Sequence, residues 1–162
     1  MKSRSMLYAA AIAIACWSTG ALAQVPQYGA NVTLEQARKA MAAAEAEARK
    51  NGWPVAIAIV DTAGHLVLFQ KADNTQTASV MVAQDKAVSA AIYRRTTKVV
   101  QDGVAAGGAG LRLLNLRGMS AVEGGIPLIV DGKIIGGIGV SGVTSDQDGV
   151  VAKAGADVVA AK

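Results

Sequence analysis

The sequence of 162 residues contains few of the side chains on which several classes of protein site depend. It has one histidine, His65, and one cysteine, Cys16. Zinc sites take their ligands chiefly from several cysteines and histidines, so a zinc site is not expected. Ser141 lies in no G-x-S-x-G motif, and no second histidine is present to form a triad with it. A serine hydrolase is therefore not indicated.

The charge pattern is also sparse, because charged residues make up 17% of the chain and aromatic residues 4%. No run of basic residues interleaved with aromatic residues occurs, and a nucleic-acid surface needs such a run. The formal net charge of +4 includes Lys2 and Arg4, so without these two residues fourteen basic residues face twelve acidic ones, a net charge of +2. We therefore expect no nucleic-acid partner.

Residues 1–23 have the three parts of a cleavable secretory signal. Lys2 and Arg4 precede an apolar run over residues 6–16, and Ala21-Leu22-Ala23 forms an A-x-A cleavage site before Gln24. The apolar run is shorter than the ~20 residues that span a bilayer, so a retained anchor is the weaker alternative, as is a lipoprotein signal. We expect the mature protein to be periplasmic or secreted, without a membrane attachment and without cysteine.

The rest of the chain is rich in alanine, valine and glycine and has room for one domain. Residues 24–31 show no periodicity and are predicted to form an extended arm before a domain over residues 32–162. Thr33 and Gln36 have capping-box spacing. The apolar residues that follow repeat at helical spacing up to Asn51-Gly52, which predicts an amphipathic helix.

Hairpins and further helices are indicated downstream. Two β-branched runs, 54–60 and 65–70, flank the turn residues 61–64, and two more, 126–130 and 133–140, flank Asp131-Gly132. Helices are predicted over 77–93, over 96–105 and from Ser145 to the C-terminus, the last with Asp148 in its cap. A mobile glycine-rich loop is predicted over 106–117, and a short strand near 119–122. Hairpin-joined strands with helices grouped between them predict an α+β fold, an antiparallel sheet of about five strands flanked by helices.

Gly137 to Gly142 match the G-x-G-x-x-G pattern of dinucleotide-binding folds, after a strand and before a helix. Such folds continue with a second parallel strand and an acidic residue about twenty positions on. Neither feature follows here, so the glycines are expected to serve close packing at the end of a strand.

Four local motifs occur together in a fixed order. They are Asp61-Thr62-Ala63-Gly64-His65-Leu66-Val67, Ala83-Gln84-Asp85-Lys86-Ala87, Gly124-Gly125-Ile126-Pro127-Leu128 and Gly136-Gly137-Ile138-Gly139-Val140-Ser141-Gly142, with Asp148 beyond. In this set the chain resembles the GlcG/HbpS family of haem-binding or haem-degrading domains over about residues 32–160. The resemblance implies a profilin-like α-β-α sandwich, assembly into homo-oligomers and, for some members, binding of haem or another tetrapyrrole. Other members stand beside glycolate or corrinoid metabolism.

The candidate site residues follow from this resemblance and from side-chain chemistry. Imidazole is a common haem ligand, so His65 is the candidate axial ligand of the iron, the alternative being a polar residue that opens a strand. Tyr93, Met81 and Met119 are fallback ligands. Lys86 and Arg94 are candidate partners of the propionates; alternatively, Lys86 forms a surface pair with Asp85, and Arg94 caps a helix with Arg95.

The sequence therefore predicts an exported haem- or tetrapyrrole-binding protein that forms a homo-oligomer. Two alternatives stay open: an enzyme or accessory protein that acts on a small organic acid, with Lys86 and Asp61 in its pocket, and an oligomeric scaffold without a ligand. Asp61 is otherwise a turn former, since its side chain can accept hydrogen bonds from nearby backbone donors. The glycines of 107–110 belong either to a loop that closes over a ligand or to a slack connection.

Overall fold

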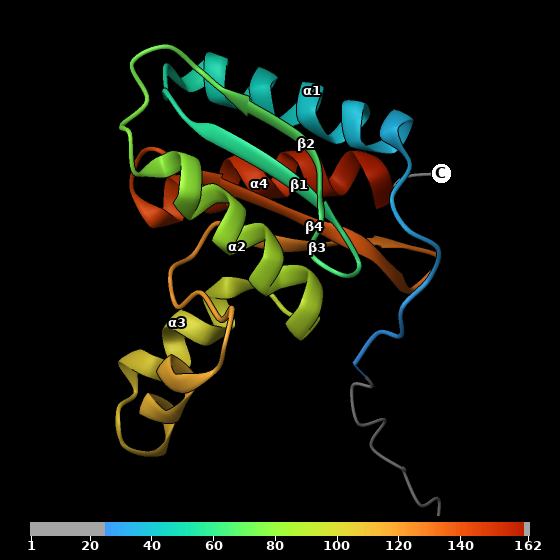
Figure 1. Cartoon of the computed structure of the whole chain (residues 1–162). Helices are drawn as coiled ribbons and strands as arrows, with labels where there is room; N and C mark the ends of the chain where they lie inside the picture. The colour runs from blue at the N-terminus through green and yellow to red at the C-terminus, as the bar shows by residue number, and fades with distance from the viewer. Residues whose placement is uncertain (1–24, 161–162) are drawn as a thin grey trace, which may run out of the picture.

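The helices and strands lie within residues 25–160, the part of the chain that the computed structural model describes (Figure 1). The predicted signal, residues 1–23, lies outside this part. The elements are α1 (Leu34–Asn51), β1 (Ala56–Asp61), β2 (Leu66–Lys71), α2 (Ser79–Tyr93), α3 (Thr97–Ala105), the 3-10 helix η1 (Gly108–Asn115), β3 (Gly125–Val130), β4 (Lys133–Ser141) and α4 (Ser145–Ala160). None of these helices combines the length and the apolar character that crossing a bilayer requires.

The sheet has four strands in the order β2-β1-β4-β3, and every neighbouring pair is antiparallel. This confirms the α+β class and the antiparallel sheet, although the sheet within residues 25–160 has four strands rather than five. The strand predicted near 119–122 is a loop. Its backbone is held by a turn, in which Met119 N–H donates to the Leu116 carbonyl, and by a side chain, since Ser120 N–H donates to Ser89 Oγ.

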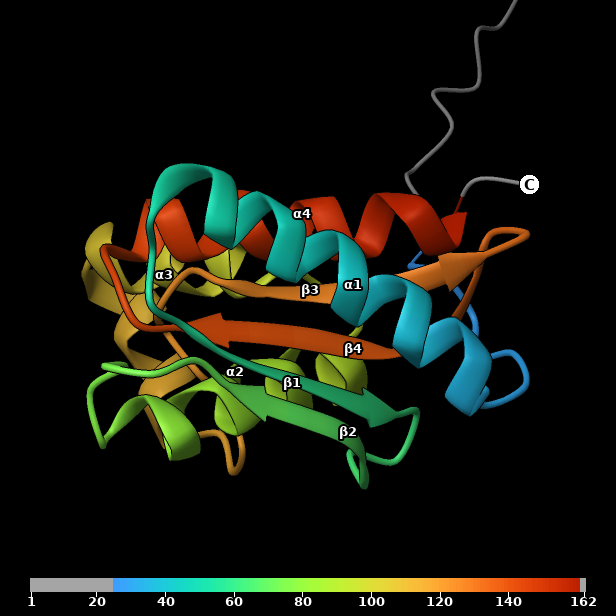
Figure 2. The same cartoon turned by 90° about the horizontal axis from the view of Figure 1, so that it is seen from above.

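Helices cover both faces of the sheet, and Figure 2 shows α1 and α4 above it and α2 below. Alternate side chains of β1 divide between the two layers. Ile57 and Ile59 join the core formed with α1 and α4, whereas Ala58 and Val60 face the alanines of α2. A strand that is buried on both faces loses the polar-apolar alternation, which explains why β1 and β4 read as continuous apolar runs.

Close packing of α2 on β4 explains the G-x-G-x-x-G pattern. A Cβ atom on Gly139 would lie 2.1 Å from the carbonyl oxygen of Ala83, and one on Gly137 would lie 2.5 Å from that of Ala87. Both distances are far below van der Waals contact, so these strand positions require glycine. The expectation that the glycines serve packing is confirmed.

Helix boundaries agree with the capping chemistry in α1 and differ at α4. Thr33 and Gln36 form both hydrogen bonds of the capping box, and α1 ends at Gly52 with φ at 67°. At α4 the predicted cap is displaced by one residue. The Gln147 side chain accepts from Thr144 N–H at 3.3 Å. Asp148 is buried, and its Oδ1 atom accepts from Val143 N–H at 3.2 Å, ahead of the helix.

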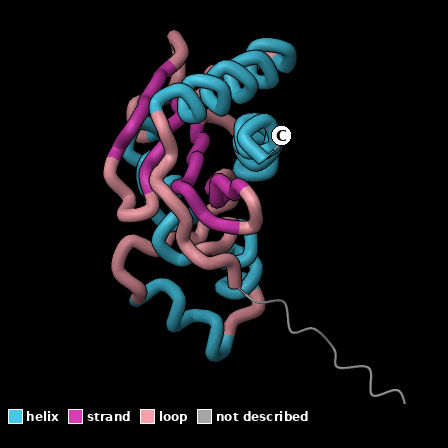
Figure 3. The backbone as a smooth tube through the Cα atoms, turned by 90° about the vertical axis from the view of Figure 1, so that its right-hand side faces the viewer, coloured by secondary structure: helices cyan, strands magenta, loops and turns pink. Residues whose placement is uncertain are grey.

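Two segments extend the sandwich. Residues 27–32 run beside the start of β4, where Gly29 N–H donates to the Ile134 carbonyl and Ile134 N–H to the Gln27 carbonyl. The stretch 106–117, predicted as a mobile loop, contains the 3-10 helix η1, which packs on α3. In Figures 1 and 3 this α3–η1 arm lies below the sheet, away from α1.

Candidate functional site

The turn between β1 and β2 is built around the carboxylate of Asp61. Its Oδ1 atom accepts hydrogen bonds from the N–H groups of Ala63 and His65, both at 2.9 Å, and its Oδ2 atom lies 3.3 Å from Nδ1 of His65. Desolvation raises the pKa of Asp61, but the hydrogen bonds from His65 and Ala63 outweigh it, so the pKa lies below the ordinary aspartate value. The predicted role of Asp61 as a turn former is confirmed.

The imidazole of His65 projects from this turn into solvent, with 81% of its side-chain surface exposed. In the tautomer with a proton on Nδ1, the ring donates to Asp61 Oδ2 and the Nε2 lone pair is available for a metal. A carboxylate behind a histidine in this way fixes the orientation of the ring. The described residues contain no cluster of three or more His, Cys, Asp or Glu side chains suited to a metal ion.

The outer face of α2 lies next to this turn. A Cβ atom on Gly64 would lie 3.2 Å from Val88 and 3.6 Å from Ile92, and one on Gly118 would lie 3.3 Å from Ile92. The histidine turn and the loop 118–120 thus pack against the same helix face. A cavity of about 340 Å³ opens there. Its lining consists of Asp85, Val88, Gly118, Met119 and Ser120, which brings the fallback ligand Met119 to this face.

Lys86 lies in the interior, with 1% of its side chain exposed. Its Nζ atom donates to Asp148 Oδ2 at 2.7 Å and to the Val140 carbonyl at 2.9 Å. Burial raises the pKa of Asp148, and the interactions with Lys86 only partly oppose this. The predicted surface pair of Lys86 with Asp85 is wrong, because the two side chains leave α2 in different directions, Asp85 into solvent and Lys86 toward α4. No sequence pattern indicates the observed partner, Asp148, which is 62 residues away.

Arg94 anchors the N-terminal segment to the end of α2. Its guanidinium carbon lies 5.4 Å from the centre of the Tyr28 ring, and its Nη1 atom donates to the Pro26 carbonyl at 3.4 Å. The Tyr28 hydroxyl donates to the carbonyl of Ile92 at 2.9 Å. Neighbouring Arg95 caps the same helix end by donating from Nε to the Tyr93 carbonyl.

The predicted site residues thus have separate surroundings. His65 contacts Asp61 at the end of β1, Lys86 contacts Asp148 inside the sandwich, and Arg94 contacts the N-terminal segment. Asp61 and Lys86, the two residues named for the enzyme alternative, also lie beside different positions along β4. Asp61 pairs with Gly136 across the sheet, four positions along β4 from the Val140 carbonyl that Lys86 contacts.

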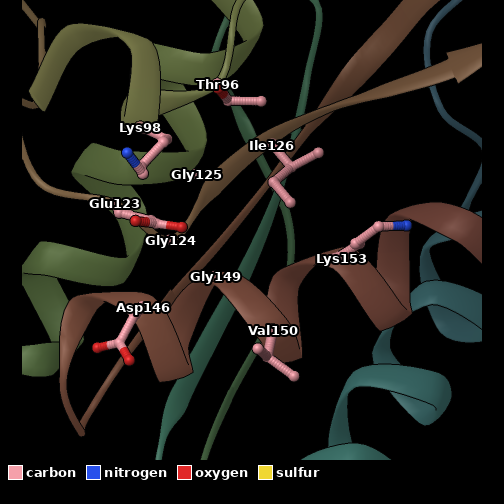
Figure 4. Close-up of a pocket in the computed structure, with 10 residues that line it drawn as sticks. All are labelled: Thr96, Lys98, Glu123, Gly124, Gly125, Ile126, Asp146, Gly149, Val150 and Lys153. Atoms are coloured by element: carbon pink, nitrogen blue, oxygen red, sulfur yellow. The ribbon is translucent and has the colours of Figure 1, made fainter. Parts of the chain in front are cut away.

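A second cavity, of about 330 Å³, lies between α3, the start of β3 and α4 (Figure 4). Glu123 lines it together with Gly124 and Gly125. Glu123 is not among the predicted site residues, because it lies too far from Asp61 in the sequence for spacing to indicate a catalytic carboxylate pair. The available signal was the Glu-Gly-Gly sequence at the start of β3, because paired glycines indicate close backbone packing: a Cβ atom on Gly125 would lie 2.3 Å from the Lys86 carbonyl oxygen.

A family model and a relative of known sequence indicate the same family for this chain. The model of the family described as haem degrading protein HbpS-like matches residues 32–157. Protein GlcG of Escherichia coli K12 is 41% identical over 107 residues, which cover 66% of this chain and 78% of GlcG.

Solved structures agree with this result. A double mutant of HbpS from Streptomyces reticuli superposes with a TM-score of 0.75 at 31% identity, covering 96% of this chain and all of that one. The PduOC:Heme complex superposes with a TM-score of 0.72 at 27% identity, covering 79% of this chain and 94% of that one. On the family model, the relative and the shared fold, this chain belongs to the HbpS-like family, the GlcG/HbpS family that its four motifs indicated.

Proposed function

We propose that this protein binds haem or a closely related tetrapyrrole and that His65 is the axial ligand of the iron. The observation that carries the proposal is the Asp61–His65 pair, because it holds an exposed imidazole with Nδ1 facing a carboxylate. Bound haem would supply an iron centre for redox or oxygen chemistry. The protein's contribution at this turn is a ring held in one orientation by Asp61.

Apolar side chains beside His65 support a macrocycle as the ligand. Leu66, the next residue, pairs with Val60 and is 51% exposed on the α2 side of the sheet. Phe69 and Val88 are partly buried in the same layer. Exposed apolar surface next to a metal-binding side chain is a common sign of a ligand face. The PduOC:Heme complex shows that this fold occurs in a haem complex in a relative.

The propionate partners remain predictions, and the surroundings of the two residues differ. Lys86 would have to give up Asp148 and leave the interior before it could reach a surface carboxylate. Arg94 is partly exposed and holds only a cation–π contact and one hydrogen bond to a carbonyl. Of the two residues, Arg94 is the one that could turn toward a propionate at low cost.

Haem titration followed by the Soret band tests this proposal. The wild-type protein is expected to shift the band with saturation, His65→Ala to abolish that shift, and Asp61→Asn to weaken it because the ring loses its fixed orientation. Lys71→Ala, at the other end of β2, is the matched control and should bind as the wild type does. No saturable shift with the wild type would end the proposal. An unchanged shift in His65→Ala would remove His65 from the site and indicate nonspecific binding of an apolar ligand.

We also propose that the protein is exported to the periplasm or secreted and forms a homo-oligomer. Export rests on the signal pattern of residues 1–23, and N-terminal sequencing of the native protein should begin at Gln24. A sequence beginning at Met1 would refute cleavage. Self-association rests on the family and on exposed apolar side chains of the α3–η1 arm, among them Leu111 at 50% and Leu114 at 60%.

A further inference from the structure

The cavity between α3, β3 and α4 holds a carboxylate that the haem proposal does not use. Figure 4 shows the Glu123 side chain directed toward the centre of this cavity, whereas Asp146 and Lys153 point outward from its rim. Ile126 and Val150 form apolar walls, and glycine backbone forms much of the remainder. Lys98 and Thr96 complete the lining, so Glu123 is the acidic side chain directed inward and Lys98, Asp146 and Lys153 are the other charged residues around the cavity.

The Glu123 carboxylate accepts no hydrogen bond from any residue in the described range 25–160. Lys98 is the nearby cation and attracts Glu123, but its Nζ atom already donates to both oxygens of Asp102 at 2.6 Å. Lys153, the other lysine at the cavity, is likewise paired with Asp157 at 2.5 Å. Each of the two lysines thus already has another carboxylate as its hydrogen-bond partner. The charge of Glu123 is left to water or to a ligand.

The backbone that carries Glu123 is fixed at three consecutive residues. Glu123 N–H donates to the side-chain oxygen of Gln101 at 2.8 Å, the Gly124 carbonyl accepts from Val140 N–H at 2.9 Å, and Gly125 N–H donates to the Thr97 hydroxyl at 2.8 Å. These partners come from α3 and β4. A charged group on so constrained a segment loses little conformational entropy when it binds a ligand.

The opposite wall leaves space for this carboxylate. Gly149 stands inside α4, where glycine costs about 1 kcal/mol relative to alanine. A Cβ atom at that position would lie 2.7 Å from Glu123 Oε1 and 3.1 Å from its Cγ. The helix thus contains a poor helix former at the point where the Glu123 side chain packs. This close fit keeps the carboxylate directed along the wall and into the cavity.

We propose that this cavity binds a small organic cation, a protonated primary amine with a short apolar body, whose ammonium group contacts Glu123. The ammonium supplies the donors that the carboxylate lacks, and the apolar body lies against Ile126 and Val150. A volume of about 330 Å³ is at the lower limit of ligand pockets and suits a small molecule. The cavity is built on α3, β3 and α4, whereas the His65 turn packs on α2, so this inference is independent of haem binding.

The test uses three probes of nearly the same shape: n-butylammonium, butyrate and 1-butanol. Each is titrated into the ¹⁵N-labelled protein while the amide signals of Gly124, Gly125 and Gly149 are followed by NMR. We expect n-butylammonium to give saturable shifts at these amides with millimolar affinity, as suits so small a probe. Because 1-butanol lacks the charged hydrogen bond to Glu123, it should bind at least about tenfold more weakly than n-butylammonium. Butyrate should bind more weakly still, since its charge has the same sign as that of Glu123.

Variants assign the binding to the carboxylate. Glu123→Gln keeps the side-chain shape and should weaken n-butylammonium at least about tenfold. Asp146→Asn, the matched control at the rim, should change its affinity by less than about twofold. Gly149→Ala should also weaken binding by displacing the Glu123 carboxylate. If Gly149→Ala fails to fold, the result for Glu123→Gln decides the test. Equal binding of butyrate, undiminished binding by Glu123→Gln, or no saturable shift with n-butylammonium would each overturn the proposal.

Discussion

Replacement of Asp148 by alanine removes the carboxylate that lies 2.7 Å from the buried ammonium of Lys86. The variant leaves Lys86 charged, 1% exposed, and with the Val140 carbonyl as its remaining partner among the described residues. An uncompensated buried charge of this kind costs about 3–5 kcal/mol. Because single domains are stable by about 5–15 kcal/mol, the loss is a large fraction of the total. For a domain of this size the melting temperature should fall by about 10–20 °C.

The reverse replacement, Lys86→Met, should show a pH dependence. Burial already raises the pKa of Asp148 while Lys86 is present, and removal of Lys86 takes away the interactions that oppose this rise. A carboxyl group whose pKa is higher in the folded state contributes stability below its unfolded pKa and loses it as the pH rises through the folded pKa. The deficit of Lys86→Met relative to the wild type should therefore shrink from about pH 7 to about pH 5.

Urea unfolding at fixed pH measures these differences. The matched control is Asp157→Ala, which breaks the Lys153–Asp157 pair on the same helix, where both side chains are more than 60% exposed. An exposed pair of this kind contributes at most about 1 kcal/mol. The double variant Lys86→Met with Asp148→Leu should regain most of the loss, since no charge remains buried. If Asp148→Ala costs no more than Asp157→Ala, the assignment of a buried, mutually dependent pair is refuted.

Three further outcomes are expected. Gly139→Ala places a Cβ atom against the Ala83 carbonyl and should cost at least about 1–3 kcal/mol in urea unfolding; a neutral effect would contradict the packing of α2 on β4. The double variant of Leu111 and Leu114 to aspartate should reduce the molar mass in light scattering without changing the circular dichroism spectrum; an unchanged mass would remove the arm from any self-contact. Asp61→Asn should destabilise the protein at neutral pH, because the lowered pKa of Asp61 contributes stability that is lost as the pH falls through that pKa. The difference in stability between variant and wild type should vanish well below pH 3.8. A difference that persists there would indicate lost packing instead.

Local features of the fold followed directly from the sequence. The capping box at Thr33 and Gln36 and the Asp131-Gly132 hairpin involve residues that are near one another in the chain, so their geometry depends on short-range hydrogen bonds and backbone preferences. The Asp61 turn belongs to the same class, since its carboxylate contacts residues two and four positions ahead. The predicted extra strand near 119–122 failed because pairing is decided by neighbours that are remote in sequence. The residue types of that segment do not show whether a neighbouring strand is available for pairing.

The candidate sites divide in the same way. By itself the sequence determined the family, the helix-covered antiparallel sheet and a single histidine in a tight turn, because motifs and periodicity are local properties of the chain. Only the tertiary structure decided that Lys86 contacts Asp148, 62 residues away, and that Gly149 of α4 leaves space for the side chain of Glu123, which lies just before β3. These contacts arise where separate elements pack. Spacing along the chain carries no information about which side chains then face each other, so burial and partnership had to come from the folded arrangement.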